Sequence, residues 1–204
     1  IVEEITGKTV RDNMKERLID PLGLKDTATF LDDEMYSRLV TCYYITPDKK
    51  KQAMSAEADG ILRPGGAPDG SRANLNCSCR DFVVFMSMLA NDGKYKGERL
   101  LGRKTIDLMR TNQLCEAALN DFHRDNGPDI LGYGYGMGVR TLMDKASGCS
   151  NGSIGAFGWS GGYGSWAESS PEDRLAVVYM HNTQGERNEL FHIKVRNVVY
   201  GAIE

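Results

Sequence analysis

The sequence predicts an α+β fold in which helices come first and antiparallel strands with a covering helix come last. Three observations indicate this order: apolar residues at helical spacing up to residue 111, strand-like runs from residue 133 onward, and an amphipathic helical pattern at the end. A sheet with one apolar face buries that face beneath such a helix. We therefore assign residues 1–130 to part of a helical region, and residues 131–204 to the C-terminal strands and helix of an α/β region.

Two helical patterns open the chain. Residues 1–5 have the spacing of the last turns of a helix that begins before Ile1, and Gly7 stands where a left-handed residue ends a helix. Thr9 precedes a second apolar stripe as its N-cap, and Pro21 is expected to stop that helix.

A strand, a loop and a third helix are expected next. Residues 41–46 are β-rich and predict a short strand, whereas residues 59–76 are interrupted by Pro and Gly and predict a loop. Ser78 with Asp81 forms a capping box, and Gly93 ends the helix that follows. Its predicted buried residues are Phe82, Phe85, Met86 and Leu89.

The rest of the chain predicts one more helix, a long loop, four strands and a final helix. The helix covers residues 104–111, with Ile106, Leu108 and Met109 inward, and the polar residues 112–130 form the loop. The strand-like runs are residues 133–142, 154–161, 162–169 and 174–183. The final helix covers residues 186–203 and is expected to place Leu190, Phe191, Val195, Val198, Val199 and Ala202 against the sheet.

Composition narrows the classes of partner. The net charge is −3 with both signs interspersed, and the short run Lys49–Lys51 is a solvated turn, so we expect no nucleic-acid partner. No stretch is apolar enough to span a membrane. The five cysteines have no ligand spacing, so free thiols, no metal and no cofactor are expected. Free thiols favour a reducing compartment such as the cytoplasm, but the sequence leaves the localisation open.

The run from Ala156 to Trp166 is the most informative stretch, since it holds both tryptophans and several residues with little side chain. Its small-to-bulky alternation suits a strand, and the glycines leave peptide N–H groups uncovered. Uncovered N–H groups can stabilise an oxyanion. The simplest alternative is a Gly-rich central strand with both tryptophans in the core.

Four stretches together resemble one known family. They are residues 1–24, 64–114, 133–139 (YGYGMGV) and 155–176, which includes GAFGWSGGYGSW. In this order they resemble the C-terminal portion of the serine β-lactamase and penicillin-binding-protein superfamily, on the branch of class C β-lactamases, D-alanyl-D-alanine carboxypeptidases and related esterases. The resemblance implies an incomplete β-lactamase/transpeptidase-like fold.

Members of this superfamily carry three active-site elements, and this chain matches one of them. The elements are S-x-x-K, whose Ser attacks a carbonyl, Y-x-N, which joins the proton relay, and a K-T-G-like triplet on a strand. Neither S-x-x-K nor Y-x-N occurs in the chain, and by the family order both are expected upstream of Ile1. The triplet aligns with Trp159, Ser160 and Gly161.

By that correspondence the Gly162 N–H is the candidate oxyanion donor. Ser160 is expected to hydrogen-bond substrate, Gly161 to let the backbone approach it, and Tyr163 to line the substrate site. Trp159 stands where β-lactamases and carboxypeptidases have a Lys or His that holds the substrate carboxylate. An indole offers an apolar face and one N–H, so strong β-lactam hydrolysis is not expected.

The resemblance implies a serine hydrolase that forms an acyl-enzyme on an ester, amide or β-lactam, of small-molecule or peptide-like type. Without its Ser and Lys, the chain alone is expected to be inactive. It is also expected to associate with the missing N-terminal segment or with itself, because its sheet would expose an edge. Two alternatives stay open: a non-catalytic scaffold or peptide-binding domain, and an independent hydrolase in which Gly158–Gly162 is a G-x-S-x-G elbow with Ser160 and His181.

Overall fold

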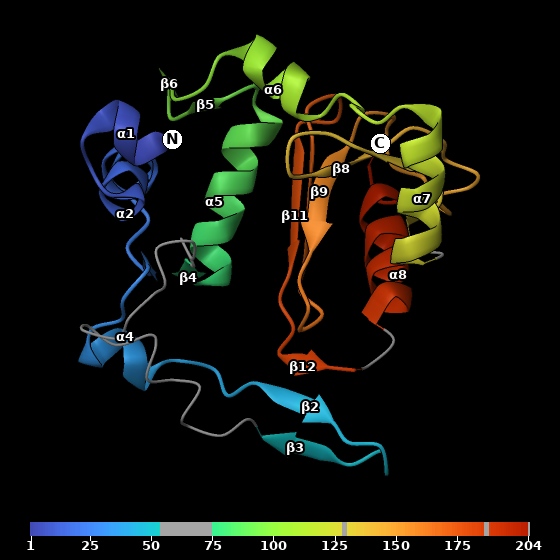
Figure 1. Ribbon diagram of the computed structural model, residues 1–204, viewed down its shortest axis with the longest axis horizontal. Helices are drawn as coiled ribbons and strands as arrows, with labels where there is room; N and C mark the ends of the chain where they lie inside the picture. Colours follow the sequence, from blue (N-terminus) through green and yellow to red (C-terminus); the bar gives the residue numbers. More distant parts are fainter. Residues whose placement is uncertain (54–74, 128–129, 186–187, 204) are drawn as a thin grey trace. The chain divides into compact units, whose positions relative to one another are not determined.

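The computed structural model describes residues 1–53, 75–127, 130–185 and 188–203 (Figure 1). The chain forms two compact units, Ile1–Phe85 and Met86–Glu204. The boundary predicted near residue 130 does not correspond to the boundary between these units. It separates a helical part of the chain from the strands, and the first strand of the large sheet begins at Tyr133.

Short helices and strands make up the first unit. Its helical segments are α1 (Val2–Thr6), α2 (Val10–Met14), the π-helical η1 (Lys15–Ile19), α3 (Asp20–Leu22) and α4 (Asp33–Ser37). Its strands are β1 (Thr27–Ala28), β2 (Tyr43–Ile45), β3 (Lys51–Ala53) and β4 (Asn76–Cys77). β2 pairs antiparallel with β3, and β1 with β4. The predicted loop over residues 59–76 lies largely outside the described residues.

The helix ends follow the predicted caps except at Pro21. Gly7 ends α1 at φ 66°, and the Thr9 side chain accepts the Asp12 N–H to begin α2. Pro21 does not stop the helical path, which continues through α3 to Gly23. Pro21 lies at the start of α3, where a residue without an N–H is tolerated.

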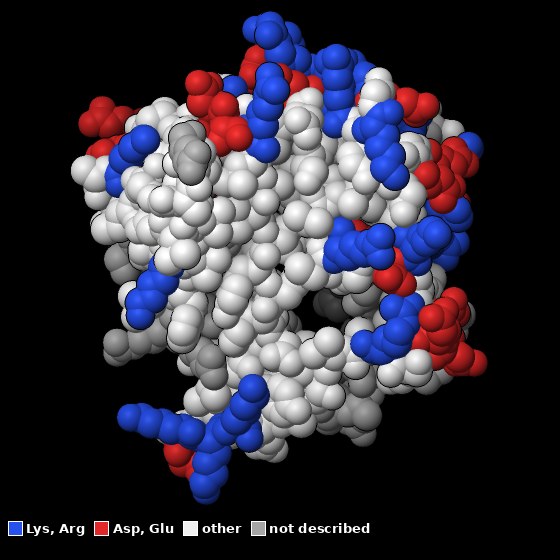
Figure 2. Space-filling model, turned by 180° about the vertical axis from the view of Figure 1, so that it is seen from behind, with Lys and Arg blue, Asp and Glu red and all other residues white. Residues whose placement is uncertain are grey.

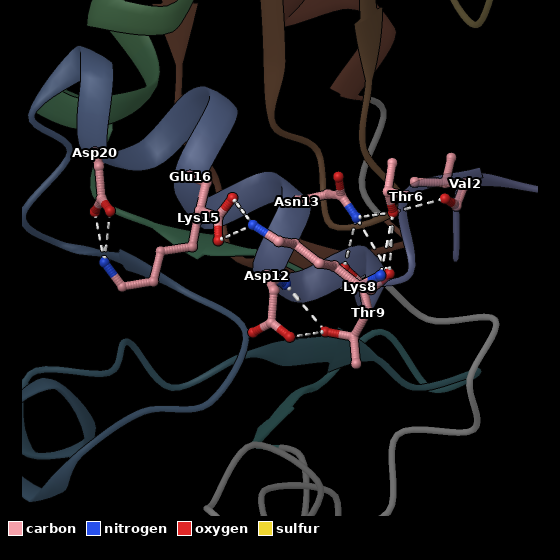
Figure 3. A network of polar contacts seen from close by, with 9 residues as sticks. All are labelled: Val2, Thr6, Lys8, Thr9, Asp12, Asn13, Lys15, Glu16 and Asp20. Atoms are coloured by element: carbon pink, nitrogen blue, oxygen red, sulfur yellow. Dashed lines mark hydrogen bonds and ion pairs between the residues drawn. The ribbon is translucent and has the colours of Figure 1, made fainter. Parts of the chain in front are cut away.

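A buried asparagine joins α1 to α2 (Figure 3). Asn13 Nδ2 donates to Thr6 Oγ1 at 2.8 Å, to the Lys8 carbonyl at 3.2 Å and to the Thr9 carbonyl at 3.0 Å. The ion pair between Lys8 and Glu16, at 2.6 Å, is half exposed and therefore adds little. The buried amide is what fixes the angle between these two short helices.

The predicted capping box at Ser78 is present in one direction only, because the Ser78 N–H donates to the Asp26 carbonyl at 3.1 Å and not to the Asp81 side chain. Ser78 Oγ accepts the Asp81 N–H at 3.2 Å and begins α5 (Cys79–Ala90). The Asp81 carboxylate also accepts the Asp26 N–H at 2.7 Å and the Thr27 hydroxyl at 2.9 Å. Asp81 thus ties the start of the helix to β1.

The second unit is built around a five-stranded antiparallel sheet in the order β11-β10-β9-β8-β7. Its strands are β7 (Tyr133–Tyr135), β8 (Arg140–Leu142), β9 (Phe157–Ser160), β10 (Trp166–Ser170) and β11 (Leu175–Tyr179). The remaining elements are β5 (Lys94–Tyr95), β6 (Glu98–Arg99), α6 (Arg103–Met109), α7 (Glu116–Asn126), β12 (Thr183–Gln184) and α8 (Asn188–Tyr200). Antiparallel strands followed by a covering helix confirm the predicted α+β fold class.

Several predicted elements differ in detail. The run 133–142 is a hairpin of β7 and β8 rather than one strand, because the chain reverses at the glycines between them. The predicted loop 112–130 contains α7, a polar helix without a fully buried residue, which is why its sequence resembles a loop. In α6, Ile106 is buried as predicted, but Leu108 is 48% exposed.

The final helix presents a different face to the sheet from the one predicted. Leu190 and Phe191 are each 46% exposed and Val198 is 74% exposed. Among the α8 residues whose burial the structure describes, the buried ones are instead His192, Arg196 and Tyr200 (α8 lies beside the sheet in Figure 1). These three residues lie four positions apart and so share one face of the helix. They can be buried because their polar groups find hydrogen-bond partners on the side of the sheet.

Buried charges lie between α8 and the sheet. Arg196 Nη1 lies 3.9 Å from Glu168 Oε2, with both side chains 1% exposed, and donates to the Tyr133 hydroxyl at 2.5 Å. Arg140 and Glu168 both pair with Gly158, where an added Cβ would lie 1.9 Å from the Ala167 carbonyl oxygen. Only glycine fits between them.

Burial raises the pKa of Glu168, and the nearby Arg196 and Arg140 charges oppose that shift. Burial also raises the pKa of Tyr133 to about 12, so its hydroxyl stays protonated at neutral pH and its oxygen accepts from Arg196. The guanidiniums of Arg196 and Arg140 keep their protons at neutral pH, whereas the Tyr133 hydroxyl is neutral. The Glu168 carboxylate is therefore the group that can neutralise them.

The surface carries mixed charge. On the face that Figure 2 shows, Lys and Arg side chains lie beside Asp and Glu side chains in most places. Of the helices that the structure describes, none combines the length and the apolarity needed to cross a bilayer.

Candidate active site

The five predicted site residues lie at one hairpin of the sheet. β9 ends at Ser160, residues 161–165 form a turn, and β10 begins at Trp166. The expectation that residues 154–161 and 162–169 are two adjoining strands is therefore wrong at Gly161 and Gly162. The Gly161 N–H donates to the Ser165 carbonyl at 2.7 Å and the Gly164 N–H to the Gly161 carbonyl at 2.9 Å, which closes the turn.

Gly162 lies at the exposed part of this turn. Within the described part of the chain, no acceptor takes its N–H, and an added Cβ would meet no atom within 4 Å. At Gly161 an added Cβ would come no closer than 3.8 Å, to the Ser165 Cβ. Neither glycine is required by the protein's own packing. The Gly161 N–H and carbonyl are bonded within the turn, so the Gly162 N–H is the donor that stays open to a molecule from outside.

Trp159 lies in a cluster of aromatic rings. Its ring is 5.4 Å from that of Tyr135 in an edge-on arrangement and 6.5 Å from that of Phe122, while Phe122 and Tyr135 are 5.5 Å apart. Such separations are typical of favourable aromatic pairs. The indole remains 39% exposed, so it combines fixed packing with a free apolar surface beside the turn.

Ser160 and Tyr163 flank the two glycines. Ser160 pairs with Trp166 across the hairpin and is half-buried. The Tyr163 carbonyl accepts the Thr183 N–H at 3.1 Å and lies 2.9 Å from His181 Nδ1. The backbone of Tyr163 therefore helps to hold the turn. The substrate-binding roles of both residues stay predictions.

The chain around Ser160 does not have the arrangement of a nucleophile elbow. An elbow requires a strand, the Ser and then a helix, whereas here β9 turns back into β10. His181 is engaged with the turn beyond Ser160: its backbone N–H donates to Ser165 Oγ at 3.2 Å, and Ser165 Oγ donates to the His181 carbonyl at 3.0 Å. This geometry gives no support to Ser160 as a nucleophile.

Sequence reasoning missed three residues that shape this region. Phe122 comes from the unpredicted helix α7, Ser165 bonds the His181 backbone, and the His192 ring bonds the Gly164 carbonyl at 2.7 Å. A signal existed for His192, because His192, Arg196 and Tyr200 follow one another at helical spacing. The signal for Phe122 was weak, since it stands at helical spacing from Ala118 and Leu119 in an otherwise mostly polar segment.

A cavity of about 490 Å³ opens at the other end of β10. It is lined by the end of α5, by Lys94 and Lys96 near β5, and by Pro171 and Arg174 of the β10–β11 turn. None of the predicted site residues lines it. Across the ranges with described coordinates, no group of three His, Cys, Asp or Glu side chains could hold a metal ion.

The antiparallel sheet with a C-terminal helix beside it has the β-lactamase/transpeptidase-like fold, because solved structures of that fold match 98% of the chain. The chain belongs to the beta-lactamase family, since that family's sequence model matches residues 1–198.

Solved structures of the same fold cover almost the whole chain. Simvastatin synthase LovD from Aspergillus terreus superimposes with a TM-score of 0.81 at 17% identity, covering 98% of this chain and 52% of that one. EstCE1, a hydrolase with promiscuous acyltransferase activity, gives 0.79 at 22% identity, covering 98% and 53%. A penicillin-binding-protein homologue from Caulobacter crescentus gives 0.65 at 20% identity, covering 98% and 54%.

The curated relatives found by sequence are much longer than this chain. Protein Rv1367c of Mycobacterium tuberculosis is 26% identical over 184 residues, 88% of this chain and 45% of that protein. The lovastatin esterase of Penicillium rubens is 29% identical over 163 residues, 72% of this chain and 39% of that protein. The chain therefore spans less than half the length of these curated relatives.

Proposed function

We propose that the chain is the C-terminal part of a serine hydrolase that cleaves an ester, amide or β-lactam through an acyl-enzyme. The catalytic Ser and Lys come from a segment that precedes Ile1. The described chain supplies the oxyanion donor, the Gly162 N–H, and the apolar wall at Trp159. Membership of the beta-lactamase family supports the reaction class.

The observation that carries this proposal is the Gly162 N–H, which is exposed and has no acceptor among the described residues. When a serine oxygen adds to the substrate carbonyl carbon, the carbonyl oxygen becomes an oxyanion, and the serine proton passes to the neighbouring base. A donor already fixed in place stabilises that oxyanion at no cost in reorganisation. The leaving group then departs with a proton, and water releases the acyl group in the reverse sequence.

The aromatic surface favours esters with neutral acyl groups as substrates. The exposed face of Trp159 is backed by Tyr135 and Phe122 and presents no cation to a carboxylate. Two similar proteins are described as a lovastatin esterase and as a hydrolase with promiscuous acyltransferase activity, which agrees with ester chemistry.

The outer edge of the sheet is the basis for a proposed partner segment. β11 is an outer strand of the five-stranded sheet, and Val177 at its centre is buried while its other four residues are half-buried. An outer strand has unpaired N–H and C=O groups along one side. We propose that the segment preceding Ile1 covers this edge, and that another copy of the chain takes its place when that segment is absent.

Active-site labelling tests the proposed function. The product of the complete gene and the 204-residue chain are each treated with a fluorescent fluorophosphonate and a fluorescent penicillin, and the labelled peptide is identified by mass spectrometry. We expect labelling of the complete product at a Ser before Ile1 and none of the chain alone. A label on Ser160 would contradict the proposal. A folded complete product without any label would favour the non-catalytic scaffold.

Trp159 is expected to set substrate preference. In the complete product, Trp159→Lys should raise kcat/KM for a carboxylate-bearing β-lactam relative to a neutral p-nitrophenyl ester by about tenfold. The reason is that a cation near a partly exposed carboxylate contributes roughly 1–4 kcal/mol. Trp159→Phe keeps an apolar ring and is the matched control. An equal change in both variants would show that the effect comes from lost packing and not from charge.

A further inference from the structure

The turn that carries Gly162 is held from outside by two histidine rings. Its residues include Gly161, Gly162 and Gly164, so the turn by itself has little to restrict its backbone. Gly164 adopts φ 89°, a left-handed value that other residues rarely take. A donor for an oxyanion must nevertheless be fixed before the reaction. The contacts that hold this turn therefore matter for the proposed site.

His192 makes the first contact. Its Nε2 lies 2.7 Å from the Gly164 carbonyl oxygen, and the side chain is only 4% exposed. Because a carbonyl oxygen can only accept, Nε2 carries the proton in this bond. The ring is stacked on Trp166 at 6.1 Å and meets Tyr179 edge-on at 6.0 Å. These two rings, from β10 and β11, orient the imidazole so that its N–H meets the turn.

His181 makes the second contact, one residue earlier in the turn. Its Nδ1 lies 2.9 Å from the Tyr163 carbonyl oxygen, and the Thr183 nitrogen lies 3.1 Å from that oxygen and 3.3 Å from Nδ1. In the tautomer with the proton on Nδ1, both the ring and the Thr183 N–H donate to the Tyr163 carbonyl. The backbone of His181 exchanges two hydrogen bonds with Ser165 Oγ, at 3.2 and 3.0 Å. The segment that follows β11 thus runs along the turn and bonds it at two positions.

We propose that His192 and His181 are positioning residues for the oxyanion donor. Their rings hold the carbonyls of Gly164 and Tyr163, the two residues that follow Gly162, and so keep the Gly162 N–H in one orientation. The proposal rests on the proposed function of Gly162. It adds that α8, which carries His192, contributes to the reaction through the turn and not only by covering the sheet.

The two contacts are suited to this task because they act on the backbone. The turn's internal bonds, from Gly161 to Ser165 and from Gly164 to Gly161, close the loop without joining it to its neighbours. The His192 ring joins the turn to α8, and the His181 ring joins it to the segment after β11. Replacing His192 should therefore disturb kcat more than KM, since a preorganised donor acts mainly in the transition state.

The test measures the turn and the reaction separately in the complete gene product. His192→Met removes the ring N–H but keeps an apolar side chain, whereas His192→Gln offers an amide N–H at a similar reach. We expect His192→Met to speed amide hydrogen exchange at least tenfold at Gly161 and Gly164, whose N–H groups are bonded within the turn, and to lower kcat about 10- to 100-fold, with KM changed less than threefold. His192→Gln should restore most of both losses.

His123→Met is the matched control for exchange. His123 Nε2 lies 2.7 Å from the Tyr133 carbonyl oxygen, which is a similar bond far along the chain from the turn, so its loss should leave exchange at residues 161–165 unchanged. Unchanged exchange in a folded His192→Met variant would overturn the proposal, as would equal losses in His192→Met and His192→Gln. A third outcome separates the two proposals. If exchange is faster in His192→Met than in the wild type, but the folded wild-type product has no activity, only the function proposed for Gly162 is refuted.

Discussion

Gly162→Pro in the complete gene product is expected to lower kcat for an ester substrate by about 10²- to 10³-fold, the usual cost of losing one oxyanion donor. Proline has no N–H, and the Gly162 N–H has no acceptor within the described chain, so its removal breaks no internal bond. The effect should appear in kcat and kcat/KM equally, because the donor acts on charge that develops only in the transition state. Steady-state kinetics on a p-nitrophenyl ester measure it.

Gly162→Ala is the matched control for that substitution. Alanine keeps the N–H, and its Cβ would meet no protein atom within 4 Å, so the variant should fold as the wild type does. We expect the alanine variant to retain far more activity than the proline variant. If both variants had the same kcat and the same thermal midpoint, the Gly162 N–H would not be the oxyanion donor.

Arg196→Met is expected to destabilise the protein by roughly 3–5 kcal/mol, the usual cost of removing one partner of a buried ion pair. Arg196 is 1% exposed and donates to the Tyr133 hydroxyl and to the Gly148 carbonyl, at 2.5 and 3.2 Å. Its loss leaves these acceptors unpaired and removes a charge that lies 3.9 Å from the Glu168 carboxylate. The urea midpoint measures the change, and Lys194→Met, an exposed cation on the same helix, is the control.

The cost of Arg196→Met should depend on pH. Burial already raises the pKa of Glu168, and removing the guanidinium that opposes this shift raises it further above the unfolded value of about 4.3. A carboxyl whose folded pKa is raised contributes stability below its unfolded pKa and loses it as pH rises. The difference from wild type should therefore be smallest near pH 4 and grow toward neutral pH. A difference that shrinks over this interval would show that Glu168 is not the group left unbalanced.

Local signals in the sequence predicted the elements that depend on neighbouring residues. The caps at Thr9 and Ser78 and the left-handed Gly7 were predicted because a cap requires a particular residue type within a few positions. The antiparallel strands and the helix after them were predicted from the change in the spacing of apolar residues along the chain. α7 was missed because its apolar stripe is short: Ala118, Leu119 and Phe122 have helical spacing, but most of its other residues are polar and none is fully buried.

The candidate site was predicted as a set of residues but not as a geometry. The likeness of Trp159–Gly162 to a family motif located the site, and the structure confirms the fold that the motif implies. Phe122, His181 and His192 reach this region from α7, from the segment after β11 and from α8. No local pattern links residues so far apart in the sequence.

The sequence by itself determined the fold class, the family and the two adjacent glycines without side chains at positions 161 and 162, because these depend on residue type and on spacing along the chain. Only the tertiary structure decided that the glycines lie in a turn and that α8 buries His192, Arg196 and Tyr200. The physical reason is that a polar residue of a helix can be buried only where its polar group finds a hydrogen-bond or ion-pair partner. The partners of α8, at Gly164, Tyr133 and Glu168, are brought beside it only by the pairing of the strands.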